Sequence, residues 1–167
     1  MKALLISAVE LCLLRRAPQD LPSSIFLLQL MVVLNLLVGI LMVVDAQFGI
    51  VRAVLENLFG LVLMLAVIYI AMSLRGKLPR FIQTATAMLL SGLLLSLLAL
   101  PLVAWGHRSE SSESELLLLV LFIWSIVVLG HIIRHAFELP LNIGIAAALL
   151  YNLIAWNLMS LLFPVVV

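Results

Sequence analysis

The sequence predicts an all-α fold: a polytopic integral membrane helical bundle of five transmembrane helices, preceded by a short N-terminal interfacial helix. The first reason is composition, because 66% of the 167 residues are hydrophobic and 10% are charged, whereas ordinary globular domains are roughly 45–50% apolar. The second reason is patterning, because the apolar residues gather in five runs, each near the roughly 20 residues that a helix needs to cross a bilayer. The breaks between these runs are short, so we expect a single transmembrane domain over residues 1–167.

The N-terminal segment is expected to form the interfacial helix. Residues 1–16 are too short to span a membrane, and Lys2, Arg15 and Arg16 lie near the ends of this segment, where they can meet anionic headgroups. We therefore expect a short helix on the cytoplasmic surface, and packing under the helical bundle is the alternative. Two prolines within residues 17–24 prevent this helix from continuing into the first span.

Short turns separate the five predicted spans. Gly76 can end one helix and Pro79 suits the first turn of the next, so residues 75–80 are expected to form a basic turn. Residues 45–49 are expected to form another turn, and the polar residues 106–115 a solvated loop. The spans are expected at about 24–44, 54–74, 81–105, 116–133 and 143–163.

The distribution of positive charge orients these spans. Lysine and arginine favour the cytoplasmic side of a membrane. With the N-terminus inside, the outer loops hold only Arg52 and Arg108, and the cytoplasmic segments hold Lys2, Arg15, Arg16, Arg75, Lys77, Arg80 and Arg134. We therefore predict a multi-pass protein of the bacterial inner membrane with a cytoplasmic N-terminus and a periplasmic C-terminus.

A cluster of ionisable residues closes the predicted fourth span. His131, Arg134, His135 and Glu138 are three or four residues apart, which places them along one side of a helix. Ionisable residues at membrane depth are candidates for function by default. This cluster is therefore the first candidate site of the chain.

This cluster has two candidate roles, metal or haem binding and a structural role. Two histidines at i and i+4 have the spacing of metal ligands on a helix, but Arg134 beside them would repel a cation. A haem would need a histidine on a facing helix, and His107 is expected on the opposite side of the membrane. We favour the structural role, in which Glu138 pairs with Arg134 and His131 bonds to a neighbouring helix, and we expect neither a metal nor a cofactor.

Two other spans carry small and polar residues at four-residue spacing. Such residues let helices approach closely and hydrogen-bond within lipid, so we favour a packing role over a ligand role. Asn152 and Asn157 should point into the bundle, because an amide that faces hydrocarbon is costly; they can bond to another helix or line a polar path. The candidate packing or path residues are Gly92, Ser96, Gly144, Asn152 and Asn157.

Several other functions are disfavoured. The sequence has no Gly-x-Ser-x-Gly elbow, phosphate-binding glycine loop or metalloprotease motif, so we expect no enzyme. The single cysteine, Cys12, excludes an internal disulfide, and the net charge of +1 gives no reason to expect nucleic acid as a partner. Arg52 and Glu56 are four residues apart and are expected to form an ion pair. No second carboxylate lies deep enough for a proton relay, which weakens a transporter hypothesis.

Three features of the chain carry a resemblance to a known family. They are the N-terminal stretch Ala17-Pro18-Gln19-Asp20-Leu21-Pro22, the five closely spaced spans, and the fourth-span stretch from Trp124-Ser125 to Gly130-His131-Ile132-Ile133-Arg134-His135. Together they resemble short bacterial five-span proteins of the Yip-type (Ypt-interacting-protein) membrane family. The resemblance implies a polytopic scaffold or assembly factor that recruits partners at the membrane, and it carries over no catalytic residue.

The sequence leaves two main functions open. The first is a non-enzymatic membrane scaffold or accessory subunit, which acts in the lipid bilayer through helix–helix contacts with other membrane proteins or with further copies of itself. The alternative is a small transporter or channel subunit with a polar path near His131, Asn152 and Asn157. A metal- or haem-binding protein that uses His131 and His135 is a third and less favoured class.

Overall fold

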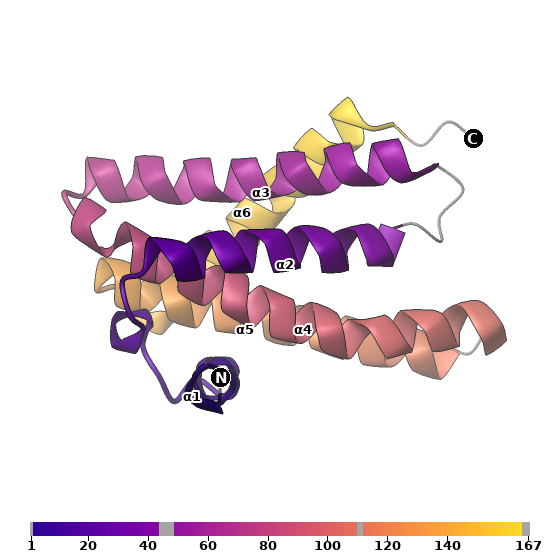
Figure 1. The fold of residues 1–167 in the computed structure, drawn as a ribbon, viewed down its shortest axis with the longest axis horizontal. Coiled ribbons are helices and arrows are strands. Elements are labelled where there is room, and N and C mark those ends of the chain that lie inside the picture. Colours follow the sequence, from indigo (N-terminus) through magenta and orange to yellow (C-terminus); the bar gives the residue numbers. More distant parts are fainter. Residues whose placement is uncertain (1, 44–48, 110–111, 165–167) are drawn as a thin grey trace.

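The computed structural model describes residues 2–43, 49–109 and 112–164, and within them the chain forms helices and no strands. The predicted turn at 45–49 therefore lies almost entirely outside the described residues. Figure 1 shows α2, α3, α4 and α5 running lengthwise, with α6 crossing them obliquely. In chain order the elements are α1 (Lys2–Cys12), the 3-10 turn η1 (Pro18–Asp20), α2 (Ile25–Val43), α3 (Gly49–Leu74), the 3-10 turn η2 (Leu78–Arg80), α4 (Phe81–Ser109), α5 (Ser112–Phe137) and α6 (Leu141–Leu162).

The helix α4 forms the centre of the bundle. Residues 84–91 of this helix are all buried, and α1, α2 and α5 pack around it. By contrast, α6 packs mainly on α5, and α3 packs mainly on α2. The fold therefore has a densely packed half around α4 and a looser half, where α3 and α6 touch each other at few places.

The prediction of five long apolar helices is confirmed, because α2 to α6 are each long and apolar enough to cross a membrane. Their bounds differ from the prediction most clearly at residues 106–115, which were expected to form a loop. That expectation is wrong for most of the stretch, because α4 continues to Ser109 and α5 begins at Ser112. Glu113 and Glu115 lie in the first turn of α5, where the helix dipole favours carboxylates. Residues that suggested a solvated loop therefore start a helix.

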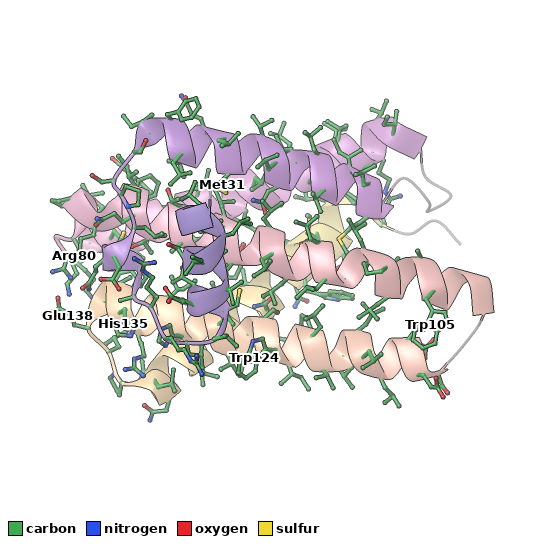
Figure 2. The ribbon with its side chains drawn as sticks, turned by 60° about the horizontal axis from the view of Figure 1, so that its bottom comes forward. Met31, Arg80, Trp105, Trp124, His135 and Glu138 are labelled. Carbon is green, nitrogen blue, oxygen red and sulfur yellow. The ribbon has the colours of Figure 1, made fainter. Side chains whose placement is uncertain are left out.

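The helix α1 lies across the bundle and not along it. Figures 1 and 2 both show its axis transverse to α4 and α5, and α1 packs on both helices. Ala8, Leu11 and Cys12 are buried, whereas Leu5 and Ile6 are exposed. The expected N-terminal helix is present and packs on the side of the bundle, and its position relative to a membrane surface stays a prediction.

Two turns at one end of the bundle hold residues in the left-handed region. Gly76 (φ 65°) follows α3, as expected for a glycine that ends a helix. Glu138 (φ 58°) follows α5, and the Leu139 N–H donates to the Arg134 carbonyl at 2.9 Å. A Cβ disfavours this conformation, so contacts must hold Glu138 in place. We call this end the basic end, and it carries Arg75, Lys77, Arg80, Arg134 and Glu138.

Candidate functional site

His131 is buried and joins α5 to the segment that follows α1. Its side chain is 4% exposed, and its Nε2 lies 3.0 Å from the carbonyl oxygen of Arg16. A carbonyl only accepts, so Nε2 must carry the proton of this bond. The ring of His135 packs edge-on at a centroid distance of 4.6 Å. The bond was expected to a neighbouring helix, but it is made instead to a backbone carbonyl in the segment between α1 and η1.

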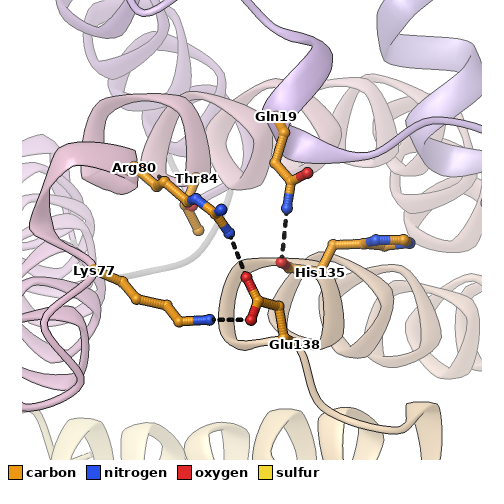
Figure 3. A network of polar contacts seen from close by, with 6 residues as sticks. All are labelled: Gln19, Lys77, Arg80, Thr84, His135 and Glu138. Carbon is orange, nitrogen blue, oxygen red and sulfur yellow. Dashed lines mark hydrogen bonds and ion pairs between the residues drawn. The ribbon is translucent and has the colours of Figure 1, made fainter.

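The two histidines have no third metal ligand near them in the described part of the chain. Within residues 2–43, 49–109 and 112–164, no group of three or more histidine, cysteine, aspartate or glutamate side chains is arranged to hold a metal ion. Glu138 points away from the histidines, toward the turn between α3 and α4 (Figure 3). In the described part of the chain, the rings of His131 and His135 are therefore the only two ligands for a metal ion at this place.

Two further bonds hold α1 against the bundle, and neither was predicted. The indole N–H of Trp124 donates to the Cys12 carbonyl at 3.0 Å. The Cys12 thiol lies 3.9 Å from the Ser91 carbonyl of α4, and burial raises its pKa to about 11. A tryptophan in the middle of an apolar run was the signal in the sequence, because an indole N–H among apolar neighbours needs an acceptor. Together with His131, these contacts fasten α1 to the middle of α4 and α5.

Glu138 clamps the two turns of the basic end together, and we call its contacts with Lys77 and Arg80 the basic clasp. Its carboxylate lies 3.0 Å from Lys77 Nζ and 2.8 Å from Arg80 Nη1 (Figure 3). Hydrogen bonds from Lys77 and Arg80 hold the pKa of Glu138 below its ordinary value. The predicted pairing of Glu138 with Arg134 is wrong, because the left-handed turn after α5 directs the carboxylate toward the α3–α4 turn.

Amide side chains fasten η1 to the same end. The Gln19 side chain donates to the His135 carbonyl at 3.0 Å, and the Gln83 side chain donates to the Leu21 carbonyl at 2.9 Å. His135 therefore contributes its backbone to the basic end, while its ring lies against His131. Within the described residues, Arg134 makes no side-chain hydrogen bond or ion pair. The four residues of the predicted cluster thus separate into a histidine pair, of which His131 is buried and His135 half-buried, an unpaired arginine and the basic clasp.

The predicted ion pair of the second span is present at the opposite end of the bundle. Arg52 Nε lies 2.6 Å from Glu56 Oε1 within α3. The same guanidinium donates through Nη2 to the carbonyl of Phe163 at 2.6 Å. The pair therefore also connects the start of α3 with the end of α6, which spacing alone did not reveal.

The asparagines of α6 bond within their own helix. Asn152 donates to the Ala148 carbonyl at 2.8 Å, and Asn157 donates to the Leu153 carbonyl at 2.7 Å. Asn152 is half-buried, whereas Asn157 is exposed, so the expectation that both point into the bundle is wrong for Asn157. Asn35, by contrast, joins two of the long helices, because it donates from α2 to the Leu89 carbonyl of α4 at 2.9 Å.

Gly144 and Gly130 lie at a close approach of α5 and α6. A Cβ on Gly144 would collide with the Gly130 carbonyl oxygen, and a Cβ on Gly130 would stand 2.8 Å from Cα of Ile145. The prediction of Gly144 as a packing residue is consistent with this crossing. Gly92 differs, because a Cβ there would meet its nearest atom, Asn35 Oδ1, at an ordinary 3.7 Å.

A cavity of about 340 Å³, which we call the lateral groove, lies between α3 and α6 with α5 behind it. Its walls are apolar almost throughout. Arg75 stands at the basic end of the groove, and Met64 and Tyr151 line it farther along the bundle. The groove exists because α3 and α6 lean on different partners, α2 and α5.

A second cavity of about 340 Å³ lies among α2, α3 and α4. It is more polar, with Asn35, Asn57 and Ser96 in its lining, and Gly92 also faces it. Met64, Met88 and Tyr151 line both this cavity and the lateral groove. The two spaces therefore adjoin; the described lining of neither includes His131, Asn152 or Asn157.

Comparison with known proteins found no relative of this chain: no family model, no curated protein and no solved structure matches it. The chemistry of the site must therefore be read from its geometry. The described side chains provide structural hydrogen bonds, one arginine without a polar partner, Arg134, and an apolar groove with Arg75 at its end. They are suited to binding, and their most specific features are the outer face of α6 and the lateral groove.

Proposed function

We propose that this chain is a non-enzymatic multi-pass membrane scaffold or accessory subunit, which binds another membrane protein or a further copy of itself through the outward face of α6. This helix packs mainly on α5, and the side opposite that contact is exposed. The outward face carries large apolar side chains that are 59–77% exposed, together with one exposed amide; its residues are Leu150, Leu153, Trp156, Leu161 and Asn157.

Asn157 is the single observation that carries this proposal. Its side-chain amide donates to the Leu153 carbonyl of the same helix, while the side-chain oxygen Oδ1 has no partner among the described residues. It lies five residues before the end of α6, about 7.5 Å along the axis. In hydrocarbon an unpaired amide oxygen is costly. A donor on a partner helix would remove that cost, and leucines around Asn157 would supply close packing.

Site-directed photo-crosslinking in native membranes tests this proposal. A photoreactive residue at Leu153 is expected to capture a defined partner, and one at Leu119 of α5, 52% exposed, serves as the lipid-facing control. Asn157→Leu should weaken the complex about 3- to 20-fold, which corresponds to roughly 0.6–1.7 kcal/mol for a hydrogen bond between membrane helices. A monomer in mild detergent, with identical crosslinking from both positions, would refute the proposal.

The alternative function, a small transporter or channel subunit, is favoured by a different observation. The lateral groove and the second, more polar cavity adjoin at Tyr151, so a path would involve Asn35, Asn57 and Ser96. In reconstituted vesicles, Asn57→Leu should then abolish solute flux, whereas Asn157→Leu on the outer face should leave it unchanged. Equal flux in both variants and in protein-free vesicles would exclude transport.

The proposed setting is the bacterial inner membrane, with the basic end and the N-terminus in the cytoplasm. The support is the excess of lysine and arginine at that end. Labelling of single cysteines in intact cells would test it, because Arg15→Cys should be protected from an impermeant reagent and Arg52→Cys should react. Membership of the Yip-type family remains a hypothesis that agrees with a scaffold role.

A further inference from the structure

The lateral groove has the length of one membrane leaflet. Along α3 it extends from Arg75 to Met64, eleven residues and therefore about 16 Å of helix. The hydrocarbon core of a bilayer is roughly 30 Å thick, so one leaflet contributes roughly 15 Å. The groove thus begins at the basic end and stops near the depth at which the tails of one leaflet end.

The size of the groove selects a slender occupant. A transmembrane helix about 10 Å wide and 30 Å long fills on the order of 2,000 Å³, whereas the groove holds about 340 Å³. A helix of a partner protein can therefore lie over the groove but cannot enter it. A hydrocarbon chain can enter, because the lining from Val67 and Ala71 of α3 to Leu129 and Ala147 of α5 and α6 is apolar.

The charge at the mouth of the groove selects an anionic headgroup. Arg75 is exposed and belongs to the groove lining, and its side chain has no hydrogen bond or ion pair among the described residues. The basic end carries four cationic side chains, and besides Asp20 of η1, whose carboxylate accepts from the Ala17 N–H, its carboxylate is that of Glu138. That carboxylate is already engaged by Lys77 and Arg80. Arg75 is therefore left to bind an anion from outside the chain.

We propose that the lateral groove binds one anionic phospholipid, with an acyl chain between α3 and α6 and the headgroup phosphate on Arg75. An arginine recognises phosphate through paired N–H donors, and basic pockets between membrane helices bind acidic headgroups. This site is separate from the outward face of α6, so it stands or falls independently of the proposed partner binding.

Lipid retention by the delipidated full-length protein tests the proposal. Phosphatidylglycerol and phosphatidylcholine with the same acyl chains are added in detergent, and bound lipid is counted by native mass spectrometry. The wild type should bind one phosphatidylglycerol about fivefold more tightly, the factor that corresponds to about 1 kcal/mol for one basic residue near the headgroup. Arg75→Gln should remove this preference, and Arg15→Gln, at an exposed arginine outside the groove, should retain it.

Filling the groove tests the position of the acyl chain. Ala71→Phe and Ala147→Phe fill it from α3 and α6 respectively and should abolish retention of both lipids. Ala66→Phe, at an exposed position of α3 outside the groove, should have no effect. If one of the two filled variants does not fold, the other still tests the position of the acyl chain. Arg75→Gln tests the site as well, because it does not change the packing of the groove.

Three results would overturn the proposal. They are equal binding of the two lipids by the wild type, a preference for phosphatidylglycerol that persists in Arg75→Gln, and undiminished retention in both filled variants. A change in oligomer size in the filled variants, with lipid binding intact, would assign the groove to protein contact and also overturn it. Crosslinking from Leu153 is measured in the same variants, so failure of the lipid site and failure of the scaffold role can be distinguished.

Discussion

Alanine in place of Gly130 is expected to force α5 and α6 apart. The added Cβ would stand 2.8 Å from Cα, N and Cγ1 of Ile145, which is 0.6 Å short of the 3.4 Å at which ordinary van der Waals contact begins. Two of these three atoms are backbone, so no side-chain rotation can relieve the overlap. Gly144→Ala meets the same obstacle from the other side, against the carbonyl oxygen of Gly130.

The size of the effect follows from two opposing terms. Overpacking of a closely packed site costs about 1–3 kcal/mol, while alanine gains roughly 0.5–1 kcal/mol over glycine within a helix. Gly92→Ala has the same gain and no overlap, because its nearest neighbour would lie at 3.7 Å. Gly130→Ala should therefore be about 1–3 kcal/mol less stable than Gly92→Ala, since the helix term is shared.

Unfolding in mixed detergent micelles measures this difference. The free energy of unfolding is obtained by titration with SDS, followed by tryptophan fluorescence, for the wild type and both alanine variants. Gly92→Ala should match or exceed the wild type, and Gly130→Ala should fall below it. Equal stability of the two variants would show that α5 and α6 do not cross at Gly130 and Gly144, and would refute the reasoning.

Three further outcomes follow from the contacts of α1 and the basic end. His131→Leu leaves the Arg16 carbonyl without its partner, at a cost of about 1 kcal/mol or more, so trypsin should cleave after Arg16 about fivefold faster. The Cys12 thiol, 7% exposed and with its pKa raised to about 11, should react with maleimide far more slowly at pH 8 than a cysteine placed at Leu13 in a Cys12→Ser background. Because the pKa of Glu138 is lowered in the fold, its ion pairs stabilise above the ordinary pKa of 4.5 and this stabilisation is lost as pH falls through the folded value. The stability difference between wild type and Glu138→Gln should therefore be present at pH 7 and vanish in acid.

Each of these outcomes has a result that contradicts it. Unchanged cleavage in His131→Leu would mean that the bond to the Arg16 carbonyl does not hold the segment after α1. Equal labelling at positions 12 and 13 would place the Cys12 side chain in solvent or lipid and not against α4. A stability difference for Glu138→Gln that is the same at every pH would show that the negative charge of Glu138 does not contribute to the basic clasp.

The features predicted correctly from the sequence depend on neighbours along the chain. Hydrophobic runs of spanning length predicted five long helices, because every backbone polar group in an apolar stretch must be satisfied within its own segment. Gly76 was predicted to end α3 because a helix commonly ends on a residue with positive φ. The ion pair of Arg52 with Glu56 needed only the i, i+4 geometry of a helix. The loop at 106–115 was mispredicted, since serine and glutamate favour the first turn of a helix as well as a loop.

The sequence by itself determined that the chain is a set of long apolar helices with one strongly basic group of turns. Only the tertiary structure decided that Glu138 pairs with Lys77 and Arg80, that His131 bonds to the Arg16 carbonyl, and that α3 and α6 leave a groove between them. The reason is that apolar residues surround each of these helices on all sides, since lipid and protein neighbours both favour them. The pattern along the chain therefore does not distinguish a packed face from an exposed one, and the arrangement of the helices in space makes that distinction.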